Sequence, residues 1–104
     1  MEKTYYAGTT STDSNGLSWR FLTDDHGFKV CKASFMRDSK GNAIVVDLDT
    51  PEFCRGRGFA RELLSQMRKR ETTKSLRVIS NDHARSYYEK LGYTEIAPNI
   101  FQAN

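Results

Sequence analysis

Apolar and polar residues alternate along the first half of the chain. Residues 17–22 (LSWRFL) and 28–35 (FKVCKASF) follow this alternation, and the turn-forming residues 24–27 (DDHG) separate them. This pattern predicts a β-hairpin with one buried face. Residues 43–49 (AIVVDLD) are instead rich in β-branched residues, which is typical of a strand covered on both faces. We therefore expect residues 43–49 to form a central strand.

The apolar residues take up a helical spacing after residue 58. One helical face carries Phe59, Ala60, Leu63, Leu64 and Met67. The basic residues 68–70 (RKR) follow, and we expect a solvated helix end that complements the helix dipole, with contact to a phosphate or an acidic partner as the alternative. Residues 76–79 (LRVI) then indicate a short strand.

A second helix is predicted by a further set of apolar residues at helical spacing, namely Ala84, Tyr87, Tyr88 and Leu91. Ser80 or Asn81 can cap its start. Gly92 suits its end, where a Schellman motif places Tyr93 against Tyr88. Residues 93–97 indicate a closing strand.

The order of these elements predicts a single domain of residues 1–104 in the α/β (α+β) class. We expect a short strand and a polar loop over residues 1–16, antiparallel strands over residues 17–50, and a β-α-β-α-β unit over residues 51–104. A strand-helix-strand unit forms a right-handed parallel crossover, so the sheet should be mixed, mostly antiparallel and twisted.

Composition places the chain among folded soluble proteins. Apolar residues make up 38% of the 104 residues and charged residues 28%. No apolar run is long enough to span a membrane, and the first residues (MEKTY) lack a signal-peptide core, so we expect a cytoplasmic protein without membrane contact. Cys31 and Cys54 have neither CxxC spacing nor nearby histidines, which predicts reduced thiols and no metal site.

The most informative segment is the glycine-rich turn over residues 54–61 (CRGRGFAR), between the predicted central strand and the first helix. Gly56 and Gly58 leave the backbone open to an anion, because no side chain covers it. The helix that follows directs its unpaired N–H groups and positive dipole end to the same place. This arrangement predicts a phosphorylated cofactor, and the net charge of +3 favours an anionic partner in general.

Two segments carry a family resemblance. Residues 55–60 have the form R-x-x-G-x-A, and residues 81–93 have the form N-x-x-A-x-x-Y-Y-E-K-L-G-Y. From about residue 44 to residue 93, the chain therefore resembles the GNAT superfamily of acetyl-CoA-dependent N-acetyltransferases. The resemblance implies acetyl-CoA as the co-substrate, an amine as the acceptor, and direct transfer of the acetyl group to that amine.

The resemblance also implies where the cofactor lies. The backbone amides that would hold its pyrophosphate belong to Arg55, Gly56, Arg57, Gly58, Phe59 and Ala60. Leu48 and Thr50, at the end of the central strand, would contact the acetyl and pantetheine arm in a gap where this strand and the next splay apart. Asn81 matches an asparagine that lines the cofactor groove, and a helix N-cap is an equally good role for it.

Three side chains are candidates for catalysis. Tyr88 matches the family tyrosine that protonates or hydrogen-bonds the departing thiolate, and a buried core tyrosine is the alternative interpretation. Asp47 and Asp49 alternate on the central strand and are the nearest candidates for a general base, with a relay through water as the alternative.

The chain departs from the family pattern in two places. Pro51 lies four residues before Arg55 instead of three, so the turn should carry an extra residue at Phe53–Cys54. The chain also lacks the two N-terminal helices that commonly form one wall of the acceptor site. An acceptor would then meet an open face of the sheet, which suits a large acceptor such as a protein lysine.

Two other functions stay open. The first is a catalytically inactive module of the same fold that captures a protein partner on the open face. The second is a nucleic-acid binder with a basic stripe of Arg55, Arg57, Arg61 and residues 68–70, but 13 acidic residues dilute this charge and make nucleic acid the weaker candidate. A homodimer is also expected if Ile100–Phe101 forms an unpaired sheet edge.

Overall fold

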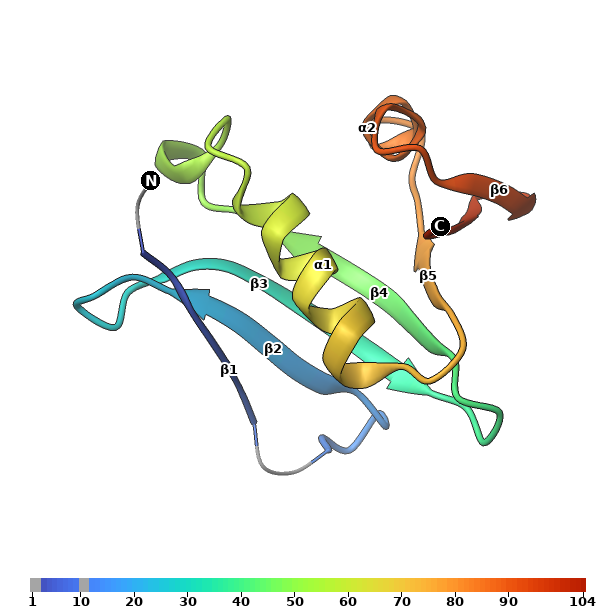
Figure 1. Ribbon diagram of the computed structural model, residues 1–104, viewed down its shortest axis with the longest axis horizontal. Helices are drawn as coiled ribbons and strands as arrows, with labels where there is room; N and C mark the ends of the chain where they lie inside the picture. The colour runs from blue at the N-terminus through green and yellow to red at the C-terminus, as the bar shows by residue number, and fades with distance from the viewer. Residues whose placement is uncertain (1–2, 10–11) are drawn as a thin grey trace.

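The computed structural model describes residues 3–9 and 12–104 (Figure 1). Within them, seven strands form one sheet in the order β1-β2-β3-β4-β5-β7-β6. The strands are β1 (Tyr5–Gly8), β2 (Ser18–Thr23), β3 (Lys29–Arg37), β4 (Ala43–Asp49), β5 (Leu76–Ile79), β6 (Thr94–Ala97) and β7 (Ile100–Gln102). All neighbouring strands are antiparallel except β4 and β5. The predicted mixed, mostly antiparallel α+β fold is confirmed.

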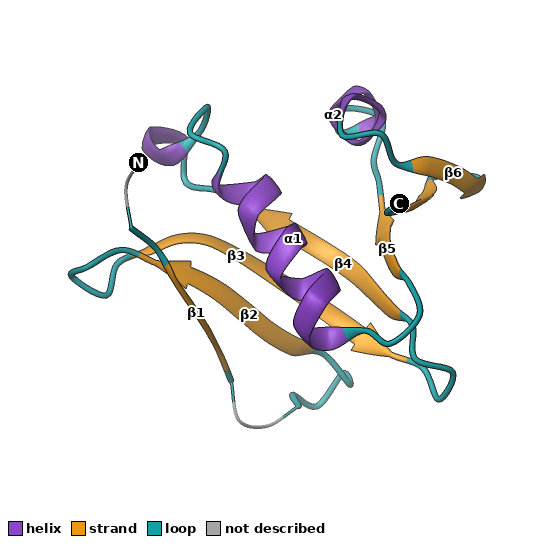
Figure 2. Cartoon of the chain, viewed as in Figure 1, coloured by secondary structure: helices purple, strands orange, loops and turns teal. Residues whose placement is uncertain are grey.

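The helices among the described residues follow β4 and β5, the two parallel strands. A short 3₁₀ helix η1 (Glu52–Cys54) and the helix α1 (Phe59–Glu71) follow β4, and α2 (Arg85–Lys90) follows β5. As Figure 2 shows, α1 lies across one face of β2–β4. The predicted stripe faces the sheet, where Phe59, Leu63, Leu64 and Met67 are buried. None of the described helices is long and apolar enough to cross a membrane.

The end of α2 has the predicted Schellman geometry. The Tyr93 amide donates to the Tyr88 carbonyl at 3.1 Å, and the Gly92 amide donates to the Glu89 carbonyl at 3.0 Å. Gly92 has a φ of 84°, which only glycine adopts readily. The Tyr88 and Tyr93 rings stack with centroids 5.9 Å apart. Capping therefore fixes how the chain leaves α2 and enters β6.

The parallel pairing of β4 with β5 is short. It joins Ala43–Val45 to Leu76–Val78, and beyond it β4 continues to Asp49 beside β3 alone among the described strands. A β-bulge at Val46 interrupts the register between β4 and β3 and bends β4 at this point. The carboxyl ends of β4 and β5 therefore separate, as the family resemblance implies.

One predicted strand has a different place in the sheet. Ile100–Phe101 is predicted at a sheet edge, and this prediction is wrong because β7 pairs with β5 on one side and β6 on the other. The chain reverses after β6 at Asn99, whose φ of 63° permits a tight turn, and β7 returns beside β5. The sheet edges are therefore β1 and β6, and the homodimer expected through Ile100–Phe101 loses its basis.

A buried ionic cluster fixes the C-terminal end of α1 to the sheet. The Glu71 carboxylate accepts hydrogen bonds from Arg20 of β2, with Nε to Oε2 at 2.7 Å and Nη2 to Oε1 at 3.2 Å. The Tyr6 hydroxyl of β1 and the Arg37 guanidinium of β3 donate to the same carboxylate. The Glu71 side chain is 5% exposed, so one buried acid joins three strands to one helix.

The cluster keeps Glu71 ionised. Burial alone would raise the pKa of this carboxyl group, but the hydrogen bonds from Arg20 and Tyr6 and the charges of Arg20 and Arg37 outweigh it, so the pKa of Glu71 lies below its usual value. Burial and the adjacent Glu71 carboxylate raise the pKa of the Tyr6 hydroxyl, which therefore remains a donor.

We expect Glu71→Gln to lower the free energy of unfolding by about 3 kcal/mol at pH 7, because it leaves the Arg20 guanidinium buried without a counter-charge. Urea denaturation measures the change. Glu62→Gln, at an exposed position of the same helix, is the matched control and should change stability by less than about 0.5 kcal/mol. Equal stability of Glu71→Gln and the wild type would contradict a stabilising role for the cluster.

The effect of Glu71→Gln should also depend on pH. Because the folded-state pKa of Glu71 is lowered, its ionised form stabilises the fold fully above the usual value of 4.5, and this contribution is lost as the pH falls below 4.5 toward the folded-state pKa. The difference in unfolding free energy between the wild type and Glu71→Gln should therefore shrink between pH 7 and pH 3. A constant difference would show that the charge of Glu71 is not responsible.

Candidate functional site

The glycine-rich turn leads from β4 into α1 through two left-handed residues. Gly56 has a φ of 78°, and Gly58, the N-cap of α1, has a φ of 83°. A Cβ atom at either position would meet no other atom within 4 Å, so the backbone conformation, not crowding, favours glycine here. The extra residue expected at Phe53–Cys54 is taken up by η1, where the Cys54 amide donates to the Pro51 carbonyl at 2.8 Å.

The start of α1 directs free amides toward this turn. Its first intrahelical hydrogen bond runs from the Glu62 amide to the Gly58 carbonyl at 3.0 Å, so the amides of residues 59–61 precede the first amide that donates within the helix. The Arg55 guanidinium donates from Nε to the Thr50 carbonyl at 3.0 Å and ties the turn to the end of β4. The turn thus combines open backbone, the positive end of a helix and fixed positive charge.

A cavity of about 410 Å³ lies between this turn, the end of β4 and α2. It is lined by Leu48, Asp49, Thr50, Cys54, Arg55, Gly56, Gly58, Phe59, Ala60, Ala84, Tyr87 and Tyr88. Nine of these are predicted site residues, so the fold brings together segments that are far apart in the sequence. Cys54, Ala84 and Tyr87 are further lining residues that the sequence analysis does not assign. Ala84 and Tyr87 lie on the same helical stripe as Tyr88, which is the signal that could have indicated them.

Three predicted site residues lie outside this lining set, namely Asp47, Arg57 and Asn81. Arg57 is part of the glycine-rich turn and borders a broader groove beside α1. No group of three or more His, Cys, Asp or Glu side chains that could hold a metal ion occurs among residues 3–9 and 12–104.

Tyr88 combines burial with a free hydroxyl. The residue is 4% exposed, and its ring packs on Phe101 with centroids 5.9 Å apart and edge-on to Tyr87 at 5.5 Å. Burial, followed by the influence of Tyr87, Tyr93 and Asp47, raises the pKa of Tyr88 to about 12. No side chain in the described part of the chain hydrogen-bonds its hydroxyl. At neutral pH this phenol is therefore a protonated donor beside the cavity.

The two candidate bases occupy successive positions of one face of β4. Asp47 lies opposite Ser34, and Asp49 lies opposite Lys32. Both aspartates are exposed, but Asp49 also contributes to the cavity lining. Asp49 is thus the nearer of the two carboxylates to the space where a cofactor would lie.

Asn81 lies in the turn before α2. Its Oδ1 atom accepts a hydrogen bond from the Ala84 amide at 2.9 Å, and its side chain is exposed. The N-cap of α2 is Ala84, without a side-chain capping bond, so the predicted role of Asn81 as the helix N-cap is wrong and its bond stabilises the preceding turn instead. Contact with a cofactor stays a prediction for this residue.

We expect Asn81→Ala to lower the free energy of unfolding by about 1 kcal/mol, because the Ala84 amide loses the Asn81 Oδ1 atom as an acceptor and keeps only the longer bond to the Asn81 carbonyl at 3.2 Å. Asn81→Asp keeps an acceptor oxygen at the same position and is the matched control, which should retain stability near the wild-type value. Thermal unfolding followed by circular dichroism compares the three proteins. An unchanged melting temperature in Asn81→Ala would argue against a stabilising role for this bond.

Comparison with solved structures shows the same fold in other proteins. The KacTA–DNA complex aligns with a TM-score of 0.70 at 14% identity and covers 88% of this chain and 69% of that chain. AtaTR bound with AcCoA aligns with a TM-score of 0.66 at 13% identity over 86% and 68%. A structure from Exiguobacterium sp. 255-15, named as an acetyltransferase, aligns with a TM-score of 0.71 at 11% identity over 98% and 93%. At these identities the likeness shows the fold.

A search of curated proteins finds no match to this chain. The family model described as Acetyltransferase (GNAT) domain matches residues 32–104, which include the glycine-rich turn, both α-helices and Tyr88. This match covers more than half of the chain and agrees with the separated strands and the cavity between them. The chain therefore belongs to the GNAT family of acetyltransferases.

Proposed function

We propose that this chain is an N-acetyltransferase that moves the acetyl group of acetyl-CoA directly to a primary amine. One observation carries the proposal: the glycine-rich turn and Tyr88 both line the one cavity between the separated ends of β4 and β5. A place for phosphate and a proton donor thus border one hollow. Acetyl transfer from a CoA thioester can use both features, one to bind the phosphates of the carrier and the other to stabilise the thiolate that leaves.

The residues around this cavity fit acetyl-CoA. The turn over residues 55–60 offers open backbone at Gly56 and Gly58 to the pyrophosphate, next to the positive end of α1. Leu48 lies on the part of β4 that no longer pairs with β5, and Thr50 follows the end of this strand, so the backbone here is available to the amides of the pantetheine arm. Phosphate and arm would therefore be held mainly by main-chain groups.

Tyr88 is assigned to the leaving group. Acetyl-CoA supplies a thioester carbonyl, the acceptor amine forms a C–N bond to its carbon, and the C–S bond then breaks to release the thiolate. The pKa of about 12 keeps the Tyr88 proton in place at neutral pH. Such a weak acid acts mainly by hydrogen-bonding the negative charge that develops on sulfur.

Asp49 is the better placed of the two candidate bases, since it lines the cavity and Asp47 does not. It would accept the proton that the amine loses as the C–N bond forms, directly or through water. The charge of Asp47 contributes to the raised pKa of Tyr88 and so helps to keep the phenol protonated. We therefore assign Asp49 as the base, and we assign Asp47 to the electrostatic environment of Tyr88.

The acceptor proposed here is large, such as a protein lysine. The described residues between β1 and β2, 9 and 12–17, contain no helix, so none of them forms a helical cover on the sheet face away from α1. Arg20 contacts Glu71 of α1 and therefore faces the helix side. Its neighbours Trp19 and Phe21 lie on the uncovered face, because side chains alternate along a strand. An inactive module that captures a protein would use the same face, and turnover distinguishes the two functions.

We also propose that residues 1–104 act as one domain in the cytoplasm. The strands of the described residues form one sheet, to which both ends of the chain contribute. Cys31 and Cys54 are buried free thiols, which fits a reducing compartment.

We expect Gly58→Asp to weaken acetyl-CoA binding at least about tenfold, because it places a carboxylate at the proposed pyrophosphate site. Aspartate tolerates the left-handed region and is a good N-cap, so the variant should fold. Gly16→Asp is the matched control, since Gly16 has a φ of 81°, has equally open surroundings and lies outside the cavity. Calorimetric titration with acetyl-CoA measures the affinities. Equal affinity of the wild type and Gly58→Asp would refute the phosphate site.

We expect Tyr88→Phe to lower turnover about 100-fold or more while acetyl-CoA affinity stays within about threefold of the wild type. The hydroxyl bonds no described side chain, so the fold should be retained. Tyr87→Phe removes a hydroxyl from the neighbouring lining residue and should retain turnover. Release of CoA from acetyl-CoA in the presence of a lysine peptide measures the rate. A wild type that binds acetyl-CoA but acetylates neither this peptide nor other amines would favour the inactive module.

A further inference from the structure

A second hollow, of about 180 Å³, lies between α1 and the segment that follows α2. Its polar lining consists of Arg61, Ser65 and Arg68 from α1 together with Tyr93 and Asn104. None of its lining residues belongs to the cofactor cavity described above. Its volume is several times the roughly 30 Å³ that one water occupies, and it is smaller than the pockets of about 300 Å³ or more that hold drug-sized ligands.

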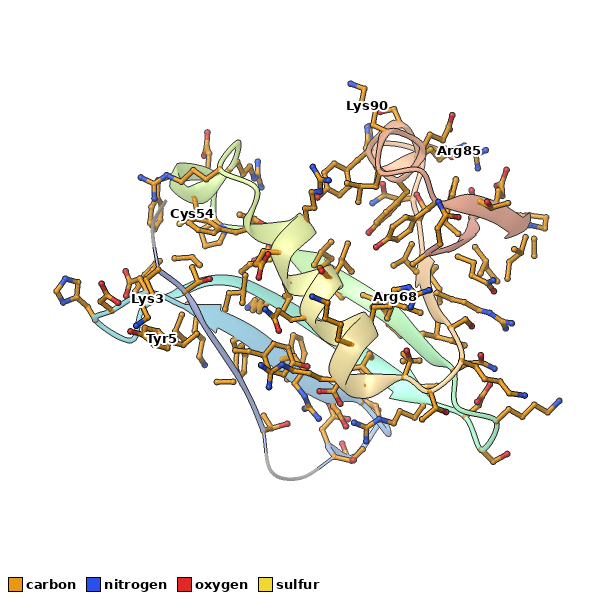
Figure 3. All side chains as sticks on the ribbon, in the orientation of Figure 1. Lys3, Tyr5, Cys54, Arg68, Arg85 and Lys90 are labelled. Atoms are coloured by element: carbon orange, nitrogen blue, oxygen red, sulfur yellow. The ribbon has the colours of Figure 1, made fainter. Side chains whose placement is uncertain are left out.

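Arg68 is only partly exposed, whereas the sequence predicts a solvated position for all of residues 68–70. In Figure 3 its side chain lies on the side of α1 that faces β4 and β5. The Nε atom is buried and has no hydrogen-bond partner in the part of the chain that the structure describes. By contrast, Arg20 and Arg85 each pair with a carboxylate. A cation that is partly removed from water without a counter-charge is unfavourable, so an anion bound beside Arg68 would be stabilising.

The groups around Arg68 suit an anion. Arg61 and Arg68 are separated by two helical turns and border the same hollow, and Ser65 lies between them. The Ser65 and Tyr93 hydroxyls can donate to an acceptor in this space. No aspartate or glutamate is among the lining residues. The hollow therefore offers two guanidinium groups and two hydroxyls, with no carboxylate side chain among its lining residues.

We propose that this hollow binds a phosphate-class oxyanion, held by Arg68 and Arg61 through charge-assisted hydrogen bonds. Two sources can supply it: free inorganic phosphate, or the phosphate monoester of a nucleotide such as the 3′-phosphate of CoA. The second source is considered because Arg61 and Ser65 also border the groove beside the glycine-rich turn. The site itself does not depend on the proposed acetyl transfer, since it is tested with inorganic phosphate alone.

The test is a titration of ¹⁵N-labelled protein with inorganic phosphate at constant ionic strength, followed by amide chemical shifts. The expected result is saturable shifts at residues 61–68 and 91–93. Arg68→Gln should weaken phosphate binding about tenfold or more. Lys69→Gln, which removes one exposed positive charge from the adjacent position of α1, should change it less than about twofold. If Arg68→Gln does not fold, Arg61→Gln, at an exposed position, takes its place.

Two outcomes would overturn the proposal: shifts that do not saturate in the wild type, or equal weakening by Arg68→Gln and Lys69→Gln, which would reveal a general charge effect. The source of the anion is resolved by comparing acetyl-CoA with its 3′-dephospho analogue. If the cofactor supplies the phosphate, the wild type should prefer acetyl-CoA and Arg68→Gln should lose that preference. If free phosphate is the ligand, the wild type and Arg68→Gln should each bind acetyl-CoA and its 3′-dephospho analogue equally. The wild type should still show the saturable shifts with inorganic phosphate described above.

Discussion

The early end of pairing between β4 and β5 is the constraint on which the rest of the structure depends. A longer parallel ladder would use the backbone groups of β4 for pairing and would close the space above Val45 and Val78. β4 instead bends at the Val46 bulge and follows β3 to Asp49. The right-handed crossover must leave from the end of β4, so the glycine-rich turn begins where the strands part. The cavity is thus a consequence of topology, and the side chains adapt it to a ligand.

The position of the helix α1 is a second constraint on the cavity. Its 13 residues correspond to about 20 Å at 1.5 Å per residue, and both ends are fixed. At the C-terminal end, Glu71 binds Arg20, Arg37 and Tyr6 on three different strands. At the N-terminal end, Phe59 and Ala60 line the cavity. A helix held in this way presents its first turn in one position, so the buried cluster contributes to the site from the opposite end of α1.

Local signals in the sequence predict most of the elements and most of the cavity. Periodicity predicts the strands over residues 43–49 and 76–79 with the bounds that the structure has, and the glycine at position 92 predicts the end of α2. These features depend on a few neighbouring residues, which a pattern can reveal. The motifs likewise contain six of the nine predicted lining residues, because each motif lies on one continuous turn or helix, and the other three lie at the end of the central strand.

Features that depend on distant pairs could not be predicted in this way. Tyr6 and Glu71 are 65 positions apart, and a glutamate at the end of an amphipathic helix is usually solvated, so nothing local indicates their contact. The place of β7 between β5 and β6 depends on which strand pairs with β5. A strand of three residues has too short a sequence pattern to predict this pairing. The same holds for Arg68, because the environment of its buried Nε atom includes Tyr93 and the residues that follow β7, which are distant in the sequence.

The uncovered face of the sheet shows how the fold tolerates a missing layer. Trp19 and Phe21 lie where a helical cover would bury them, and lysine side chains of β3 cover them instead. The Lys29 ammonium lies 4.1 Å from the centroid of the Phe21 ring, and the Lys32 ammonium lies 5.9 Å from that of Trp19. The lysine stems shield the aromatic rings while their charged ends stay in water. Such cover is displaced more easily than a packed helix, so the face proposed to receive a large acceptor remains stable in water.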